Sequence, residues 1–403
     1  MNDTDTANIA RVNEIVEKIA PELRTLTLNI HDNPELGEEE YKALVWQKEL
    51  LEKYGFDVTT GYCEIPTAYK AVYKGSKPGV KIAMLAEYDA LPEIGHGCGH
   101  SLIAMMSVGA GIAIRDFVDE YGGEIHVVGT PAEETKGAKV EMSQKGAFKE
   151  YDVAMMAHPA FIAVDSINTQ AMAAVQYEFF GKPSHAAGAP ELGINALDAM
   201  INFFNLVNAL RQQTKEDARI HGIITNGGTA ANVIPEYTAA KFYIRSNRNA
   251  DVAALKERVN KCAEGAALAT GCTFKITPVE ADFKDTVSNR RLSDLVVEKV
   301  EALGTPVIRL GGVTIPGSSD LGDVSYECPA IQISCKIKDC ENIKSFGDGT
   351  HTREFAEAAA SDYAIDEALK CVKAFTLASV DLMTKPEILA EIKEEFSHVN
   401  SDR

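Results

Sequence analysis

A short apolar segment that leads into a glycine-rich loop constrains the fold most strongly. Lys81–Ala86 is typical of a buried strand, and residues 101–119 carry apolar side chains at helical spacing. Between them lies Gly95-His96-Gly97-Cys98-Gly99-His100, in which a thiol and an imidazole stand two residues apart. Open α/β sheets place their sites in such loops, between the carboxyl end of a strand and a helix. The motif indicates an α/β fold with a candidate metal site, although a tight glycine turn around a buried cysteine would explain the same pattern.

The same arrangement recurs further along the chain. Glu124–Gly129 is a short apolar strand that runs into Glu133 and Glu134, and Tyr151–His158 is a strand that ends on a histidine. Strands that alternate with helices predict a mostly parallel sheet with helices on both faces. We expect the loops after these strands to lie side by side, because parallel strands end at the same edge of a sheet.

Two helices are expected near the amino terminus, and a second domain is expected after residue 170. The first helix covers residues 8–30 and should break near Pro21, and the second covers about 38–54. From 170 to 283 the order is strand, helix, strand, strand, helix, strand, which is the split βαβ pattern of a ferredoxin-like α+β domain. We therefore predict that residues 170–283 are inserted into a discontinuous larger domain formed by 1–169 and 284–403.

Composition excludes several classes of partner. The 403 residues include 40 basic and 59 acidic side chains, for a net charge of −19, which repels nucleic acid and anionic membranes. We find no apolar run of membrane-spanning length and no export signal at the polar, acidic amino terminus. The eight cysteines are scattered, without a CxxC pair. These features predict a cytoplasmic protein with reduced thiols.

Potential metal ligands follow the strands of the larger domain or lie in its glycine-rich loops. They are Cys98, His100, Glu133, Glu134, His158 and His351. Each has an ordinary structural explanation, but together they form a suitable ligand shell for one or two transition ions. Neighbouring side chains diverge in an extended segment, so one glutamate can bind metal while the other acts as a general base.

The chain resembles the M20 family of metallopeptidases, and within it the amidohydrolases that use a Cys-Gly-His motif. The resemblance runs in family order over nearly the whole chain. Its motifs are Leu85-Ala86-Glu87-Tyr88-Asp89-Ala90-Leu91-Pro92, Gly95–His100, Pro131-Ala132-Glu133-Glu134, Ala157-His158-Pro159, Gly181-Lys182-Pro183-Ser184-His185-Ala186-Ala187, Ala231-Asn232-Val233-Ile234-Pro235 and Gly349-Thr350-His351. It implies a catalytic domain with two divalent ions, interrupted by a lid domain that also makes a homodimer contact.

The resemblance also implies a role for individual residues. The metal ligands that it implies are Cys98, His100, Glu134, His158 and His351. Glu133 matches the general base that activates a water bridging the ions. His185 matches a lid histidine that stabilises the oxyanion, and we expect it to act in the catalytic centre of the partner subunit. Asn232 matches a lid residue that contacts substrate across the dimer, and Arg245 is a candidate for binding the substrate carboxylate.

Two positions depart from the family pattern. Many members carry a histidine where Glu87 stands, so Cys98 is expected to take its place as a ligand, and Ser101 stands where relatives often have Asp or Asn. The first departure favours the aminoacylase-like and dipeptidase-like branch over carboxypeptidases, and the second implies a different orientation of the groups around the ligands. The motifs Ala86–Leu91 and Gly95–His100 most resemble the dipeptidase and p-aminobenzoyl-glutamate hydrolase-like members. The thiolate and imidazoles favour Zn²⁺, whereas the carboxylate leaves Mn²⁺ open.

The resemblance implies a metallo-amidohydrolase that cleaves the amide bond of a small dipeptide or an N-acyl or N-aroyl amino acid. An N-acyl-amino-acid deacylase of the aminoacylase type is the alternative within the same class. A metal-bound binding protein without catalysis is the alternative from a different class, and the paired Glu133 and Glu134 argue against it.

Overall fold

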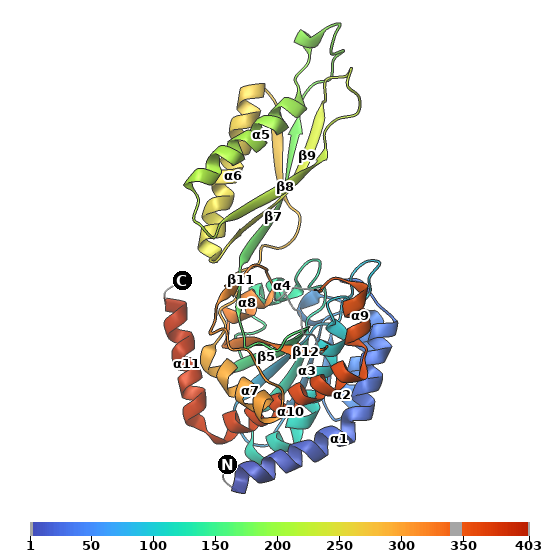
Figure 1. The fold of residues 1–403 in the computed structure, drawn as a ribbon, viewed down its shortest axis with the longest axis vertical. Coiled ribbons are helices and arrows are strands. Elements are labelled where there is room, and N and C mark those ends of the chain that lie inside the picture. The colour runs from blue at the N-terminus through green and yellow to red at the C-terminus, as the bar shows by residue number, and fades with distance from the viewer. Residues whose placement is uncertain (1–2, 339–348, 402–403) are drawn as a thin grey trace. The chain divides into compact units, whose positions relative to one another are not determined.

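The computed structural model describes residues 3–338 and 349–401, which divide into two compact units (Figure 1). The larger unit comprises Met1–Asn168, Thr286–Ile315 and Asp320–Arg403. The smaller unit comprises Thr169–Asp285 and Pro316–Ser319. The short segment Pro316–Ser319 thus groups with the inserted unit, although it follows that unit in the sequence.

A mixed sheet forms the centre of the larger unit, in the strand order β1-β2-β4-β3-β5-β12. Strands β4, β3, β5 and β12 run parallel, whereas β2 pairs antiparallel with β4 and β1 antiparallel with β2. The strands are β1 (Asp57–Thr60), β2 (Tyr69–Lys74), β3 (Lys81–Ala86), β4 (Glu124–Gly129), β5 (Val153–Ala160) and β12 (Ala330–Lys336). The mostly parallel α/β class expected from the sequence is confirmed.

Helix α3 (His100–Tyr121) is the core helix of this unit. It packs on β3, β4 and β5, and helices α1 and α10 pack on it in turn (Figure 1). A Cβ on Gly109 would lie 2.7 Å from Leu23 of α1, and one on Gly111 would lie 2.4 Å from Val127 of β4. These glycines let both neighbours approach closely. By length and composition α3 could cross a membrane, but 89% of its most apolar window is buried inside the protein, as expected of a core helix.

The remaining helices of the larger unit complete the layer structure. They are α1 (Asp3–Asp32), α2 (Tyr41–Lys53), α4 (Ala138–Gln144), α7 (Arg290–Ala302), α8 (Leu321–Ser325), α9 (Arg353–Ala359), α10 (Asp362–Thr384) and α11 (Pro386–Ser401). Short elements elsewhere in the chain are β6 (Asn168–Thr169), β11 (Thr314–Ile315), η1 (Tyr62–Glu64), η2 (Pro190–Leu192) and η3 (Arg211–Gln213).

Two expectations for these elements are wrong. Helix α1 continues through Pro21 without a break, because the buried stripe from Val12 to Ile30 needs both halves on one axis. Strand β5 does not end at His158 but continues to Ala160. It pairs with β3 only as far as Met155, so the missing N–H of Pro159 breaks no hydrogen bond of that ladder.

The inserted unit is an antiparallel sheet packed against two helices. Its strand order is β10-β7-β9-β8, and an aromatic cluster of Tyr177, Phe203 and Phe242 fills its core. The elements are β7 (Ala171–Phe180), α5 (Ala196–Leu210), β8 (Arg219–Asn226), β9 (Tyr237–Ser246), α6 (Asn249–Thr270) and β10 (Thr273–Pro278). This is the split βαβ arrangement expected from the sequence.

Candidate metal centre

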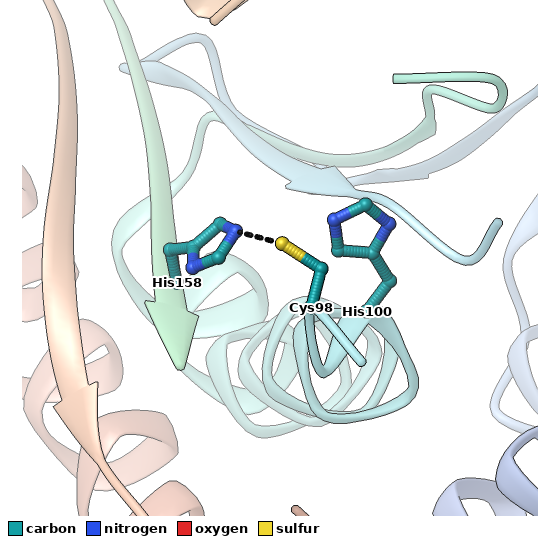
Figure 2. A group of neighbouring side chains, drawn as sticks. All are labelled: Cys98, His100 and His158. Carbon is teal, nitrogen blue, oxygen red and sulfur yellow. Dashed lines mark hydrogen bonds between the residues drawn. The ribbon is translucent and has the colours of Figure 1, made fainter. Parts of the chain in front are cut away.

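The first group of side chains comes from the start of α3. Gly99 adopts a left-handed φ of 77° directly before His100, the first residue of the helix. A Cβ at Gly99 would lie 2.9 Å from the ring of Pro159, so a larger residue does not fit. The loop thereby turns Cys98 and His100 toward the carboxyl end of β5, where His158 lies (Figure 2).

The second group lies on the turn after β4. Ala132 has a left-handed φ of 57°, and its amide donates to a carboxylate oxygen of Glu40 at 2.8 Å. Two residues later, the amide of Glu134 donates to Asp89 at 2.9 Å. Two buried carboxylates from other parts of the chain therefore fix the turn on both sides of Glu133.

Histidines from two further segments complete the cluster. His158 Nε2 lies 3.4 Å from Cys98 Sγ (Figure 2), and His351 Nε2 lies 3.3 Å from Glu134 Oε1. The amide of His351 also donates to the carbonyl of Gly97 at 3.0 Å, which ties the two loops together. Segments that are far apart in the sequence thus meet at one edge of the sheet.

The potential ligand atoms form two trios that share one sulfur. Cys98, His100 and His158 make one trio, and Cys98, Glu134 and His351 make the other. The ligand atoms in each trio lie within 4.8 Å of one another. Glu133 forms a third group with His100 and Glu134. Each trio could hold one divalent ion, and Glu133 lies next to His100 and Glu134 of these trios.

Buried atoms without partners fit such ions. His100 Nε2 and Glu134 Oε1 are inaccessible to solvent and make no hydrogen bond among the described residues. Nδ1 of His100 lies 2.9 Å from Asp89, which leaves Nε2 as the free ligand atom. Burial and the Glu134 carboxylate raise the pKa of the Cys98 thiol, so a thiolate here requires a neighbouring cation. Cys, His and carboxylate donors are those that Zn²⁺ prefers, and Mn²⁺ accepts the harder ones.

The surrounding charges are predominantly negative. Around Glu133 and Glu134 lie Glu87, Asp89 and Asp320, and the buried Lys139 and His100 oppose their charge. Burial and the neighbouring carboxylates of Glu87 and Glu134 raise the pKa of Glu133. Burial also acts against ionisation of Glu134, but the ion pair with His351 and the charge of His100 outweigh it and lower the pKa of Glu134. The two adjacent glutamates therefore differ in proton affinity, as separate roles require.

The candidate substrate-binding residues belong to the inserted unit. Nδ1 of the exposed His185 accepts the amide protons of Ala187 and Gly188 at 3.2 and 3.0 Å, so Nε2 carries the ring proton and can donate it. Asn232 is exposed, and its backbone carbonyl accepts the amide proton of Ala186, the residue after His185. Arg245 is half-buried.

Arg245 is held by two groups within the inserted unit. Its Nη1 donates to Ser318 at 2.8 Å, and its guanidinium lies 5.6 Å from the ring centre of Tyr243. An aromatic face and a hydroxyl therefore fix the guanidinium in place.

The sequence did not identify Glu40, Lys139 or Asp320. Glu40 lies in an acidic run that suggests an exposed surface, yet its side chain is buried. Lys139 is fully buried too, although lysines are mostly exposed. The only signal for Asp320 was the polar loop around it, which turn chemistry explains equally well.

Known proteins resemble this chain in sequence and in fold. Residues 167–271 match the model of a peptidase dimerisation domain. The Xaa-Arg dipeptidase of Mus musculus is 33% identical, over 96% of this chain and 91% of that protein. One of the subunits of the p-aminobenzoyl-glutamate hydrolase of Escherichia coli is 35% identical, over 69% of this chain and 61% of that protein.

A solved structure gives the same fold. A dinuclear metal-binding peptidase of the M20 family from Bacillus subtilis superposes with a TM-score of 0.61, at 18% identity, and covers 88% of this chain and 98% of that one.

Proposed function

The chain belongs to the M20 family of peptidases and amidohydrolases, and we propose that it hydrolyses the amide bond of a small dipeptide or an N-acyl or N-aroyl amino acid. The observation that carries the proposal is the pairing of Glu133 and Glu134. Glu134 lies in a trio with Cys98 and His351, and Glu133 stands beside the same group without belonging to either trio that contains Cys98. A site that only binds metal does not need the second carboxylate.

Dipeptides with a carboxyl-terminal arginine are the first substrates to test. Two relatives named Xaa-Arg dipeptidase, from mouse and human, match nearly the whole chain at 33% identity. The p-aminobenzoyl-glutamate hydrolase relative supports N-aroyl amino acids as the second class. In both classes the scissile amide lies next to a free carboxylate, which Arg245 is proposed to bind.

Two divalent ions, Zn²⁺ or Mn²⁺, are proposed to be held by Cys98, His100, Glu134, His158 and His351. When bound, they polarise the substrate carbonyl and lower the pKa of water. The sulfur ligand favours Zn²⁺. We therefore expect Cys98→Ser to lower the zinc content and the activity together.

Glu133 is proposed to transfer the protons of the reaction, and His185 is proposed to stabilise the oxyanion. Glu133 accepts a proton from the attacking water and returns it to the leaving amine, a task that suits a carboxyl group with a raised pKa. His185 offers Nε2–H to the oxyanion that forms from the carbonyl. Asn232 is proposed to contact the substrate beside His185.

The substitution Glu133→Gln tests this assignment. Loss of a general base lowers kcat by about 10²- to 10⁴-fold, while the metal content stays unchanged because the substitution removes no ligand of either trio. Glu38→Gln is the control, since Glu38 is an exposed residue whose carboxylate binds Lys136. Full activity of Glu133→Gln would remove Glu133 from the mechanism.

A homodimer through the inserted unit is part of the proposal, supported by the match to a dimerisation domain. A cytoplasmic location is proposed as well, with the free thiols of the described cysteines in support.

A further inference from the structure

Glu87 is a buried acid at the metal centre that the ligand set above does not use. It follows β3 directly, is 1% exposed, and its Oε2 makes no hydrogen bond among the described residues. That oxygen lies 3.5 Å from His100 Nε2, which is also buried and without a hydrogen-bond partner there. A carboxylate oxygen and an imidazole nitrogen, both suited to bind metal, thus face each other in a buried position without a hydrogen-bond partner among the described residues.

We propose that Glu87 is a further metal ligand, which binds through Oε2 the same ion as His100. The inference rests on the proposed function in one respect, since it requires a divalent ion at this centre. The trio of Cys98, His100 and His158 contains no carboxylate. In this role, Glu87 would supply one to the ion that His100 binds.

The separation of the two atoms supports direct binding. Donors bound at about 2.1 Å to one tetrahedral ion lie about 3.4 Å from each other. Glu87 Oε2 and His100 Nε2 are 3.5 Å apart. The pair Cys98 Sγ and His158 Nε2 is separated by 3.4 Å, and the pair Glu134 Oε1 and His351 Nε2 by 3.3 Å. Glu87 belongs to none of the three groups above, but its Oε2 approaches His100 at the same spacing as these ligand pairs.

A buried lysine fixes the orientation of the Glu87 carboxylate. Lys139 Nζ lies 2.6 Å from Glu87 Oε1 and 2.6 Å from Asp320 Oδ1, and all three side chains are almost completely buried. Asp320 also accepts the amide proton of Lys139 at 3.1 Å. Because Lys139 occupies Oε1, the carboxylate presents Oε2 to His100. Such support from outside the ligand shell is usual for metal-binding carboxylates.

The test is metal binding by the purified full-length protein, stripped with a chelator and titrated with Zn²⁺ and with Co²⁺. We expect Glu87→Gln to weaken binding of one of the two ions at least 10-fold and to change the visible absorption of bound Co²⁺, because the coordination of that ion changes. Glu87→Asp should weaken the same ion comparably, since it keeps the charge but shortens the reach. Circular dichroism reports whether each variant is folded.

A matched control is Glu367→Gln in α10. Glu367 is also largely buried and lies 2.6 Å from a lysine, Lys370, but its second oxygen accepts a hydrogen bond from Thr305 at 2.6 Å instead of facing a candidate metal ligand. We expect Glu367→Gln to leave the affinities for both ions and the absorption spectrum of bound Co²⁺ unchanged.

Unchanged affinities and spectrum in Glu87→Gln would overturn the proposal. Weak binding in Glu87→Gln with wild-type binding in Glu87→Asp would overturn it too, because charge alone would then suffice. Failure of the proposed function is separate, since it would appear as a wild-type protein that binds both ions but cleaves no amide.

Discussion

The side chain of Glu40 holds the turn before Glu133 through one hydrogen bond, which it accepts from the amide of Ala132 at 2.8 Å. Ala132 adopts a left-handed conformation with a φ of 57°, which costs a residue other than glycine about 1–3 kcal/mol. The turn keeps this conformation only while its surroundings hold it. Since Glu133 is the next residue, Glu40 positions the proposed base from a distant part of the sequence.

Removing this contact should impair turnover more than binding. In Glu40→Ala we expect kcat to fall about 10-fold or more, because small displacements of a catalytic group are costly, with KM and metal content little changed. Glu40→Gln should recover most of the activity, since its carbonyl oxygen can accept the same hydrogen bond. Equal loss in both variants would show that the charge of Glu40, and not its hydrogen bond, is required.

The buried carboxyl of Glu40 also predicts a pH dependence of stability. Burial, reinforced by the Asp89 carboxylate, raises the pKa of Glu40 to about 7. A raised pKa means that the folded state favours the protonated form, so this contribution to stability is lost as the pH rises from about 4.5 to about 7. Thermal unfolding should therefore show Glu40→Gln gaining stability relative to wild type between about pH 5 and pH 8. A constant difference across that range would contradict the raised pKa.

At the level of elements, local patterns predicted most strands and helices, but they missed β1 and did not show where packing overrides a local signal. The apolar runs at Lys81–Ala86 and Glu124–Gly129 correspond to β3 and β4 residue for residue. Pro21 was expected to break the first helix, and the stripe buried against α3 and α10 keeps α1 continuous instead. Local sequence carries no information on such contacts between distant segments.

The residues of the candidate site also fall into those that the sequence indicated and those whose contacts it could not indicate. Cys98, His100, Glu133, Glu134, His158 and His351 carry their own signal, because their residue types and loop positions suit metal chemistry. The contacts of Lys139 with Glu87 and Asp320 carry no such signal, since three segments of the chain must fold before a buried lysine finds its two carboxylates. Pairing of that kind could not be predicted from one sequence.

The continuity of α1 leads to a prediction about Pro21. This proline is exposed and occupies a helix interior, where its ring and missing N–H destabilise the helix. We expect Pro21→Ala to stabilise the protein by about 1–3 kcal/mol, the helix gain being offset in part by a more flexible unfolded chain. Urea unfolding measures the difference.

A helix substitution with the opposite expected sign is the control. A Cβ on Gly111 of α3 would lie 2.4 Å from Val127, so Gly111→Ala should destabilise by overpacking. Destabilisation by Pro21→Ala would mean that the proline supports α1 in a way that its exposed position does not suggest.

At the scale of the whole molecule, the residues proposed for catalysis belong to two separate units. Glu133 lies in the larger unit and His185 in the inserted unit. If His185 acts in the partner subunit's centre, a mixed dimer of Glu133→Gln and His185→Ala subunits keeps one intact site, formed by Glu133 of one subunit and His185 of the other. We expect mixing the two inactive variants to restore activity, measured after subunit exchange. No recovery in a verified mixed dimer would show that His185 acts within its own subunit.

The central claim is that this chain is a metal-dependent amide hydrolase, and amine release tests it most directly. Xaa-Arg dipeptides and p-aminobenzoyl-glutamate would be offered to the native protein, to the chelator-stripped protein and to the protein reloaded with Zn²⁺ or Mn²⁺. We predict cleavage of at least one substrate class, its loss on chelation and its return with one of the ions. Cleavage that survives complete metal removal would contradict the metal dependence. A fully loaded protein that cleaves neither class would contradict the account and favour a metal-bound protein that binds without catalysis.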